Sequence, residues 1–177
     1  SLGCEFIETD VQVSSDGIPY IFHDETLTRL LNRDDVFSSL HSNEIDNLKI
    51  FDEHSIPKLE TVLRMFPDMK FQIDVKTDEV AMPALAIIQK NNAMDRVCIA
   101  SFNSKRLSLV NNNYPDICIS MGPYEVAKML LSSFGLYKKT ILGNCLQIPI
   151  YEYGIKLVTK RFVKFIHSKG LKVCVWT

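Results

Sequence analysis

Short apolar runs alternate with amphipathic segments along this chain. Six of the apolar runs are predicted to be β-strands, at residues 4–11, 71–75, 97–101, 117–121, 145–150 and 172–176. Their apolar residues are continuous rather than alternating, which is typical of parallel strands covered on both faces. Between them, apolar residues at helical spacing predict helices over 57–66, 80–91, 105–112, 124–133 and 160–169. Strands that alternate with helices in this way indicate a βα architecture.

Capping residues predict where several of these helices begin and end. Pro57 is expected in the first turn of the first helix, and Pro123 is expected to open the fourth. Ser104 and Thr159 precede the third and fifth helices, where a side-chain oxygen can accept a free backbone N–H group. Gly170 supplies a stop for the last helix.

The segment after the first strand is too short to hold a helix. It contains the turn-forming sequence Ser-Asp-Gly and then a second apolar run that ends at His23 and Asp24. We therefore predict a hairpin over residues 10–24, whose return strand brings His23 back over the carboxylates of the first strand. Residues 25–56 are polar and predict a loop or small excursion beside this site. The length suits one domain, so residues 1–177 are interpreted as a single domain.

Two acidic residues, Glu8 and Asp10, lie at the end of the first strand. Side chains two positions apart point to the same face of a strand, so these carboxylates are expected to converge. Both faces of the strand are otherwise largely apolar, and a buried carboxylate pair without a cation is costly. Hard divalent cations prefer oxygen ligands, so metal binding is favoured over a charged outer face of an edge strand.

Asp74 and Lys76 repeat this spacing at the end of the second predicted strand. In a parallel barrel, functional groups gather at the carboxyl ends of the strands. Asp74 would then supply a third oxygen ligand, and Lys76 a positive charge for a phosphate or a developing oxyanion. A salt bridge at a strand end is the alternative for this pair.

An imidazole follows the return strand of the predicted hairpin. His23 suits general acid or base catalysis, and Asp24 can either orient its ring or cap the helical turn that follows. Phe102 and Trp176 also follow strand ends, where each can line a substrate pocket or pack in the core. The other three histidines have no partner in spacing and are interpreted as surface or structural residues.

Charge and cysteine usage narrow the classes of partner. The net charge is −1, which favours neither a broad nucleic-acid-binding surface nor an anionic-membrane surface. No apolar run approaches the roughly 20 residues that span a bilayer, so we expect no stable membrane insertion. The five cysteines form no C-x-x-C pair and are interpreted as buried free thiols in a reducing compartment, which favours a cytoplasmic location.

The sequence resembles the glycerophosphodiester phosphodiesterase family. The resemblance is carried mainly by F-I-E-T-D-V-Q-V-S-S-D-G-I-P-Y-I-F-H-D-E-T-L-T-R at 6–29. Five shorter stretches follow in the order that the family shows: I-P-K-L-E-T-V-L, F-Q-I-D-V-K, I-A-S-F, L-Q-I-P and V-C-V-W-T. The resemblance implies a TIM (β/α)8-type barrel and a Ca²⁺ or Mg²⁺ cofactor. It also implies hydrolysis of small-molecule substrates, such as glycerophosphocholine or glycerophosphoethanolamine, to sn-glycerol 3-phosphate and an alcohol.

The resemblance also assigns roles to the candidate residues. It implies that Glu8, Asp10 and Asp74 bind the metal, that Lys76 binds the phosphate, and that His23 is the second catalytic histidine, which protonates the leaving group. The family more often has Glu where Asp74 stands. Internal attack by a hydroxyl of the substrate, giving a cyclic phosphate, is favoured by resemblance to related barrel phosphodiesterases.

The family pattern has parts that this sequence does not contain. The family opens with an H-R-G strand and a P-E-N segment that carry its first catalytic histidine, and its last strand ends near T-D. We therefore expect barrel strands 1 and 8 to be absent from these residues, which alone could be inactive. Two alternatives remain: a lysophospholipid or phosphoinositide phosphodiesterase, and a non-catalytic barrel fragment that assembles with another chain. A homo-oligomer also remains open.

Overall fold

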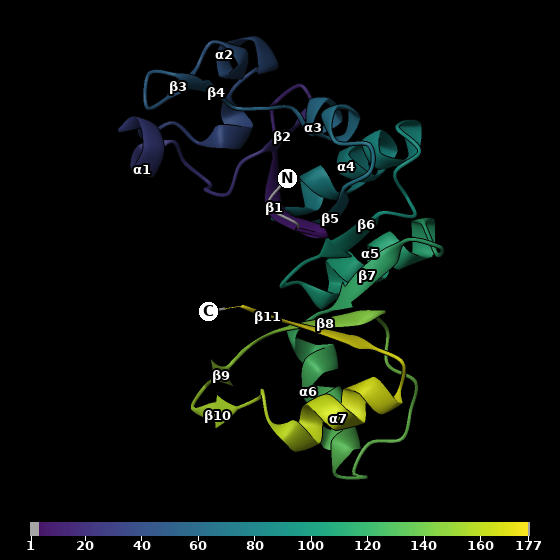
Figure 1. Cartoon of the computed structure of the whole chain (residues 1–177). Coiled ribbons are helices and arrows are strands. Elements are labelled where there is room, and N and C mark those ends of the chain that lie inside the picture. The colour runs from purple at the N-terminus through teal and green to yellow at the C-terminus, as the bar shows by residue number, and fades with distance from the viewer. Residues whose placement is uncertain (1–3, 177) are drawn as a thin grey trace. The chain divides into compact units, whose positions relative to one another are not determined.

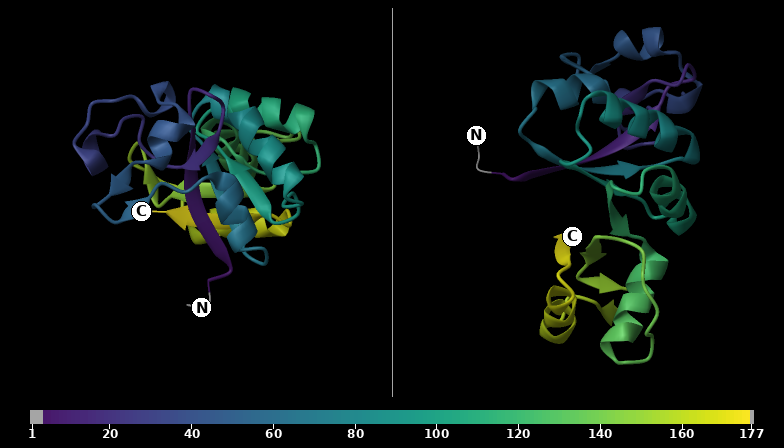
Figure 2. Two further views of the ribbon diagram at one scale, coloured as in Figure 1. Left: turned by 90° about the horizontal axis from the view of Figure 1, so that it is seen from above. Right: turned by 90° about the vertical axis from the view of Figure 1, so that its right-hand side faces the viewer.

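The computed structural model describes residues 4–176 and contains two compact units. Unit 1 ends at Ile99, and unit 2 begins at Ala100. Figures 1 and 2 show the elements of both units coloured along the chain. Each unit is a sheet with helices packed against it, as the alternation of strands and helices predicts.

The sheet of unit 1 carries the predicted site residues. Its strands follow the order β6-β5-β1-β2, with bounds β1 (Phe6–Val13), β2 (Pro19–Ile21), β5 (Lys70–Val75) and β6 (Val97–Ala100). β1 and β5 run parallel, whereas β1 and β2 are antiparallel and are joined by a turn in which Gly17 has a φ of +84°. Helices α3 (Leu59–Met65) and α4 (Asp78–Lys90) pack against each other, and α4 also packs on β1 and β5.

Residues 25–56 form a small layer beside the β1–β2 hairpin (Figure 2). The layer contains α1 (Thr28–Leu31), η1 (Phe37–Ser39), α2 (Ser42–Asp46), β3 (Lys49–Ile50) and β4 (His54–Ser55). Its buried centre is Phe37, whose ring stacks on Phe22 at 4.6 Å between centroids and meets Tyr20 edge-on at 5.9 Å. The polar composition of this segment therefore conceals a small apolar core, which joins the segment to the return strand.

Unit 2 contains three parallel strands and a core of its own. The strands are β7 (Cys118–Met121), β8 (Cys145–Pro149) and β11 (Lys172–Trp176), and β9 (Tyr151–Glu152) and β10 (Ile155–Lys156) form a separate hairpin. The helices are α5 (Ser104–Asn113), α6 (Pro123–Ser133) and α7 (Lys160–Ser168). Leu146 and Ile148 of β8 are buried with Met129 of α6 and with Phe162 and Ile166 of α7, so α6 and α7 cover the sheet (Figure 1).

Two predictions about helix starts were wrong. α5 is capped by Asn103, whose side chain accepts from the backbone N–H groups of Lys105 and Arg106, and Ser104 is its first residue. Pro57 lies before α3 rather than in its first turn, because its carbonyl accepts from Ile21 N–H of the return strand at 2.9 Å. The N-cap role of Thr159 is confirmed by its bond from Phe162 N–H.

The fold class is confirmed as α/β with a mostly parallel sheet. Among the described residues neither unit closes its sheet into a barrel, so the closed TIM barrel and the absence of its strands 1 and 8 stay predictions. Cys98 and Cys145 are buried, as expected, whereas Cys118 is partly exposed and Cys4 and Cys174 are exposed. No helix between residues 4 and 176 is both long enough and apolar enough to cross a bilayer.

Candidate active site

The register of β1 and β5 brings two predicted ligands face to face. Asp10 and Asp74 are direct partners in the parallel ladder. Parallel strands in register place their side chains on a common face, so the two carboxylates point the same way. Both side chains are largely buried, with Asp10 19% and Asp74 10% exposed. Two like charges in this position repel each other, so a neighbouring positive charge stabilises them.

Lys76 supplies one positive charge to both carboxylates. Its Nζ lies 2.7 Å from Oδ1 of Asp10 and 2.8 Å from Oδ2 of Asp74. Burial lowers the pKa of the ammonium, but the hydrogen bonds to Asp10 and Asp74 more than offset this, so the pKa of Lys76 is raised. The salt bridge that was the alternative for Asp74 and Lys76 is therefore present. It is compatible with the predicted site, since the same ammonium neutralises two of its three predicted ligands.

One carboxylate oxygen at this site has no hydrogen-bond partner. Oδ1 of Asp74 is buried and accepts no hydrogen bond, while Oδ2 of the same residue is bound to Lys76. A buried anionic oxygen left unpaired carries a large desolvation cost. A hard divalent cation would satisfy it, because carboxylate oxygens are the ligands that Ca²⁺ and Mg²⁺ prefer. The residues present therefore fit the predicted cation.

Glu8 belongs to the same electrostatic cluster. Its pKa is raised, first by burial and then by the negative charges of Asp10 and Asp74, while Lys76 and His23 lower it. Glu8 therefore lies within electrostatic range of Asp10, Asp74, Lys76 and His23. Glu8 is nevertheless an exposed residue, so the expectation of a buried Glu8–Asp10 pair is wrong. β1 becomes buried only from Val11 onward, and Glu8 lies nearer its open end.

His23 is held by a carboxylate and an arginine that follow it in the sequence. Its Nδ1 lies 2.7 Å from Oδ1 of Asp24. Arg29 donates two hydrogen bonds to the same carboxylate, from Nε to Oδ2 at 2.7 Å and from Nη2 to Oδ1 at 3.0 Å. The guanidinium of Arg29 and then the imidazole of His23 lower the pKa of Asp24. Asp24 therefore orients the ring rather than capping α1, and the contact is made by Nδ1 of His23 and not by Nε2.

Hydrogen bonds to backbone carbonyls hold the return strand and His23 against β1. Phe22 N–H donates to the carbonyl of Asp10 at 3.1 Å. Gln12, which is 2% exposed, donates from Nε2 to the carbonyls of His23 and Asp24. Sequence reasoning missed both Gln12 and Arg29. Gln12 lies two positions after Asp10 and so shares its face, which is the one signal in the sequence that indicated a role for it.

The two predicted aromatic residues lie in unit 2. Phe102 and Trp176 contact each other edge-on, with 6.2 Å between ring centroids. They are 69% and 44% exposed, so core packing is excluded for both. Their role in lining a substrate pocket stays a prediction.

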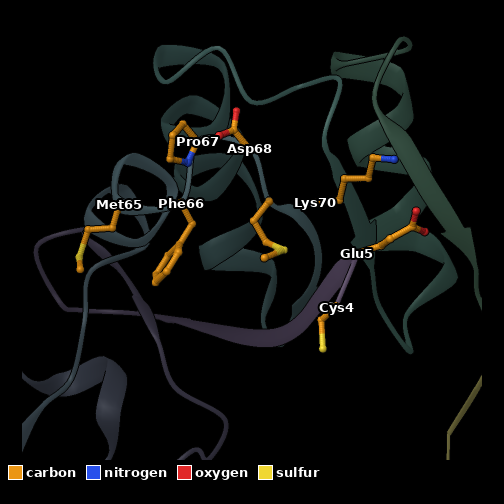
Figure 3. A pocket seen from close by; sticks show the side chains of 8 residues that line it. Cys4, Glu5, Met65, Phe66, Pro67, Asp68 and Lys70 are labelled. Carbon is orange, nitrogen blue, oxygen red and sulfur yellow. The ribbon is translucent and has the colours of Figure 1, made fainter. Parts of the chain in front are cut away.

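A pocket in unit 1 lies at the opposite ends of the same strands. Cys4, Glu5 and Lys70, where β1 and β5 begin, line it together with Met65, Phe66 and the turn after α3 (Figure 3). Asp10 and Asp74 lie toward the carboxyl ends of those strands. This pocket is therefore separate from the carboxylate cluster and contains none of the predicted site residues.

Comparison with known proteins relates the chain to one protein family. The sequence matches the Glycerophosphoryl diester phosphodiesterase family over residues 1–177. A Mycobacterium tuberculosis protein named Probable glycerophosphodiester phosphodiesterase 2 is 29% identical over 99% of this chain and 69% of its own length. The glycerophosphodiester phosphodiesterase of Caldanaerobacter subterraneus is 31% identical to this chain. The match covers 68% of this chain and 55% of that relative's length.

Solved structures of similar proteins share the fold. The glycerophosphodiester phosphodiesterase of Agrobacterium tumefaciens superposes with a TM-score of 0.77 at 21% identity, covering 98% of this chain and 74% of that one. An Oleispira antarctica phosphodiesterase in complex with the product sn-glycerol-3-phosphate gives 0.77 at 21% identity, over 99% and 73% of the two chains. With the match over all 177 residues, these findings confirm the resemblance seen in the sequence. The chain belongs to the glycerophosphoryl diester phosphodiesterase family.

Proposed function

We propose that this protein hydrolyses glycerophosphodiesters to sn-glycerol 3-phosphate and an alcohol with the help of a divalent cation. The observation that carries the proposal is the unpaired, buried Oδ1 of Asp74 within a cluster of three carboxylates, one lysine and one histidine. Family membership gives the reaction class, and this cluster supplies groups suited to it. Glycerophosphocholine and glycerophosphoethanolamine are the substrates that we infer.

Glu8, Asp10 and Asp74 would hold the cation, with Ca²⁺ or Mg²⁺ as the candidates. When bound, the cation supplies Lewis-acid stabilisation of negative charge on the phosphate. The short side chain of Asp74 keeps its carboxylate close to β5, where Lys76 is already bound to its other oxygen. Of the three proposed ligands, Glu8 and Asp10 on β1 would therefore be the more exposed, and Asp74 on β5 the more buried.

Lys76 would bind the phosphate of the substrate. Its ammonium already lies between Asp10 and Asp74, and the raised pKa keeps it protonated at neutral pH. A fixed positive charge in a partly buried site stabilises charge that develops on phosphate oxygens during the reaction. Lys76 thus has two roles: it neutralises the carboxylates in the free protein and the phosphate in the complex.

His23 would give a proton to the departing alcohol. Because Nδ1 is bound to Asp24, proton transfer takes place at Nε2. In the reaction, a P–O bond to the alcohol breaks, a new P–O bond forms to the attacking oxygen, and the proton from His23 completes the alcohol. The attacking hydroxyl passes its own proton to a general base, the role that the resemblance gives to the family's first catalytic histidine. We favour attack by the neighbouring glycerol hydroxyl, giving a cyclic phosphate that water then opens. Phosphorus NMR of a reaction in progress would detect the cyclic ester, and its absence at every time point would favour direct attack by water.

The activity test uses glycerophosphocholine and measures release of glycerol 3-phosphate. We expect release that requires Ca²⁺ or Mg²⁺ and stops when a chelator is added. His23→Gln is expected to lower kcat by about a hundredfold or more, in line with general acid catalysis. A folded protein that binds the cation yet releases nothing would contradict the proposal and would favour a non-catalytic barrel module. Faster turnover of lysophosphatidylcholine than of glycerophosphocholine would favour the lipid-substrate alternative.

A further inference from the structure

The near-zero charge of the chain conceals a sharp separation between its two units. Residues 1–99 contain 9 Lys and Arg against 18 Asp and Glu, whereas residues 100–177 contain 11 against 3. Within residues 126–177 the one acidic residue is Glu152, set against nine Lys and Arg. Unit 2 is therefore strongly basic, although the net charge of the whole chain indicated no such surface.

Part of this charge borders a groove in unit 2. The groove has a volume of about 500 Å³ and is formed by α6, the loop after it and α7. Lys138 and Lys139 of the loop and Lys169 beside α7 line it, together with apolar residues such as Ile141 and Phe165. All three lysines are exposed, and the ammonium of Lys169 lies 5.5 Å from the centre of the Phe165 ring.

Exposed apolar side chains lie next to these lysines. Leu136 is 75% exposed, Phe134 is 54% exposed, and Leu131 at the end of α6 is 46% exposed. Arg161 of α7 lies over the ring of Phe134 at 4.2 Å and also donates to the carbonyl of Ser133 at 3.0 Å. These contacts join the loop to α7, so the cationic and apolar groups belong to one surface of unit 2.

The turn that presents Leu136 is an ordered structure. Leu136 N–H donates to the carbonyl of Leu131 at 3.0 Å, Gly135 N–H donates to that of Ser132 at 2.9 Å, and Gly135 has a φ of +75°. This is a hydrogen-bonded helix end with glycine in the left-handed conformation. Ser132 Oγ also donates to the carbonyl of Tyr137. The leucine side chain therefore points outward from a braced backbone.

We propose that this surface binds the face of a membrane that contains anionic lipids. Its cationic part is Lys138, Lys139, Arg161 and Lys169, and its apolar part is Leu131, Phe134 and Leu136; we call the seven residues the basic face. Clustered lysines and arginines attract anionic headgroups, while neighbouring apolar side chains enter the boundary between headgroups and acyl chains. Such binding needs no helix that crosses the bilayer.

The apolar residues distinguish a membrane from a nucleic acid as the occupant. Binding to nucleic acid is dominated by phosphate contacts, with base edges or stacked bases supplying the rest. A leucine that is 75% exposed at the tip of a braced turn gains little from either contact. It gains from an apolar medium, because burial of its side chain removes apolar surface from water.

The test measures sedimentation of the full chain with lipid vesicles. We expect binding to vesicles of phosphatidylcholine with about 30% phosphatidylglycerol, little binding to phosphatidylcholine alone, and release as salt rises from about 0.1 to 0.5 M. The double variant K138E/K139E is expected to bind at least about tenfold more weakly. The control K49E/K105E makes the same charge change at exposed lysines outside the basic face and is expected to bind as the unaltered protein does.

A further variant tests the apolar part. L136S is expected to weaken binding to anionic vesicles while leaving the charge unchanged, and circular dichroism would confirm that each variant is folded. Equal binding to both kinds of vesicle, no binding to the anionic ones, or equal losses in K138E/K139E and K49E/K105E would overturn the proposal. The proposal would also be overturned if a DNA duplex of about 20 base pairs released the protein from anionic vesicles at a concentration below that of the anionic lipid. None of these outcomes depends on the proposed enzymatic activity.

Discussion

Asp10 and Asp74 face each other across the β1–β5 ladder and share the ammonium of Lys76. The pair is the point at which the fold creates the site, because the parallel register alone places the two carboxylates side by side. Without a positive charge their repulsion would oppose the pairing of the strands. In the free protein Lys76 supplies that charge, and in the proposed enzyme a cation shares the task.

Removal of the Lys76 charge should make stability depend on the cation. We expect Lys76→Met to lower the melting temperature in the presence of a chelator, because two partly buried carboxylates then lack their shared partner. Added Mg²⁺ or Ca²⁺ should raise the melting temperature of the variant more than that of the unaltered protein. Differential scanning fluorimetry with and without cation checks this. Lys76→Arg, which keeps the charge, is the matched control, and an equal response of all three proteins would contradict the interpretation.

Asp24 should affect catalysis through the orientation of His23. Asp24→Asn keeps the shape of the side chain but removes the charge that binds both the imidazole and Arg29. We expect kcat to fall roughly ten- to a hundredfold with KM nearly unchanged, in line with other residues that position a catalytic or metal-binding group. Steady-state kinetics measures both quantities.

Arg29 offers a graded version of the same experiment. Arg29→Lys keeps a positive charge but loses the bidentate hydrogen bonding to Asp24. We therefore expect a smaller loss of kcat than in Asp24→Asn. A rise in KM with kcat unchanged in either variant would show that these residues act on binding and not on the orientation of His23.

Acid should destabilise the layer formed by residues 25–56. The pKa of Asp46 is lowered by its hydrogen bond from Lys58 and then by that from Tyr20. A carboxyl group whose pKa is lower in the folded than in the unfolded chain stabilises the fold above its unfolded pKa, near 3.9, and loses this effect as the pH falls. We expect the free energy of unfolding to decrease from about pH 5 downward, and Asp46→Asn to decrease less steeply.

Urea titrations at several pH values measure this difference. Asp46 is partly exposed, so we expect the effect at neutral pH to be within about 1 kcal/mol. Asp52→Asn, on a residue in the same layer with no ion pair among those described, serves as the control. A profile for Asp46→Asn that runs parallel to that of the unaltered protein would count against the assignment.

Phe37 should be the most sensitive core position of the same layer. It is fully buried and contacts both Tyr20 and Phe22 of the return strand region. Phe37→Ala is expected to cost about 3–5 kcal/mol of unfolding free energy, as other truncations of buried aromatic residues do. Urea denaturation measures the loss. Phe51→Ala, at a residue 72% exposed in the same layer, is expected to cost less than about 0.5 kcal/mol, and similar costs for the two would be inconsistent with a core centred on Phe37.

Some contacts of the candidate site could be predicted from the sequence and others could not. The proximity of Asp10, Asp74 and Lys76 was predictable because strand periodicity and strand ends determine where such side chains point. Arg29 was not, since its contact with Asp24 depends on how α1 turns back after the return strand. The core around Phe37 was also concealed, because the few buried apolar residues of this polar segment, among them Leu27 and Ile45, show no clear periodicity.

Helix ends show the same limit on a smaller scale. Ser104 and Asn103 are both good capping residues, and the sequence does not decide between them. The structure chooses Asn103, while Ser104 donates its hydroxyl proton to Glu125 of α6. The choice thus depends on a partner 21 residues away, which no local pattern contains.

The proposed function depends on one divalent cation bound by Glu8, Asp10 and Asp74. Isothermal titration calorimetry of the metal-free protein with Ca²⁺ and with Mg²⁺ measures this binding. We predict binding of one equivalent of at least one of these ions, and a loss of at least tenfold in affinity in Asp74→Asn, while Asp68→Asn in the turn after α3 binds as the unaltered protein does. Absence of binding by the folded protein, or equal affinity in Asp74→Asn, would contradict the account.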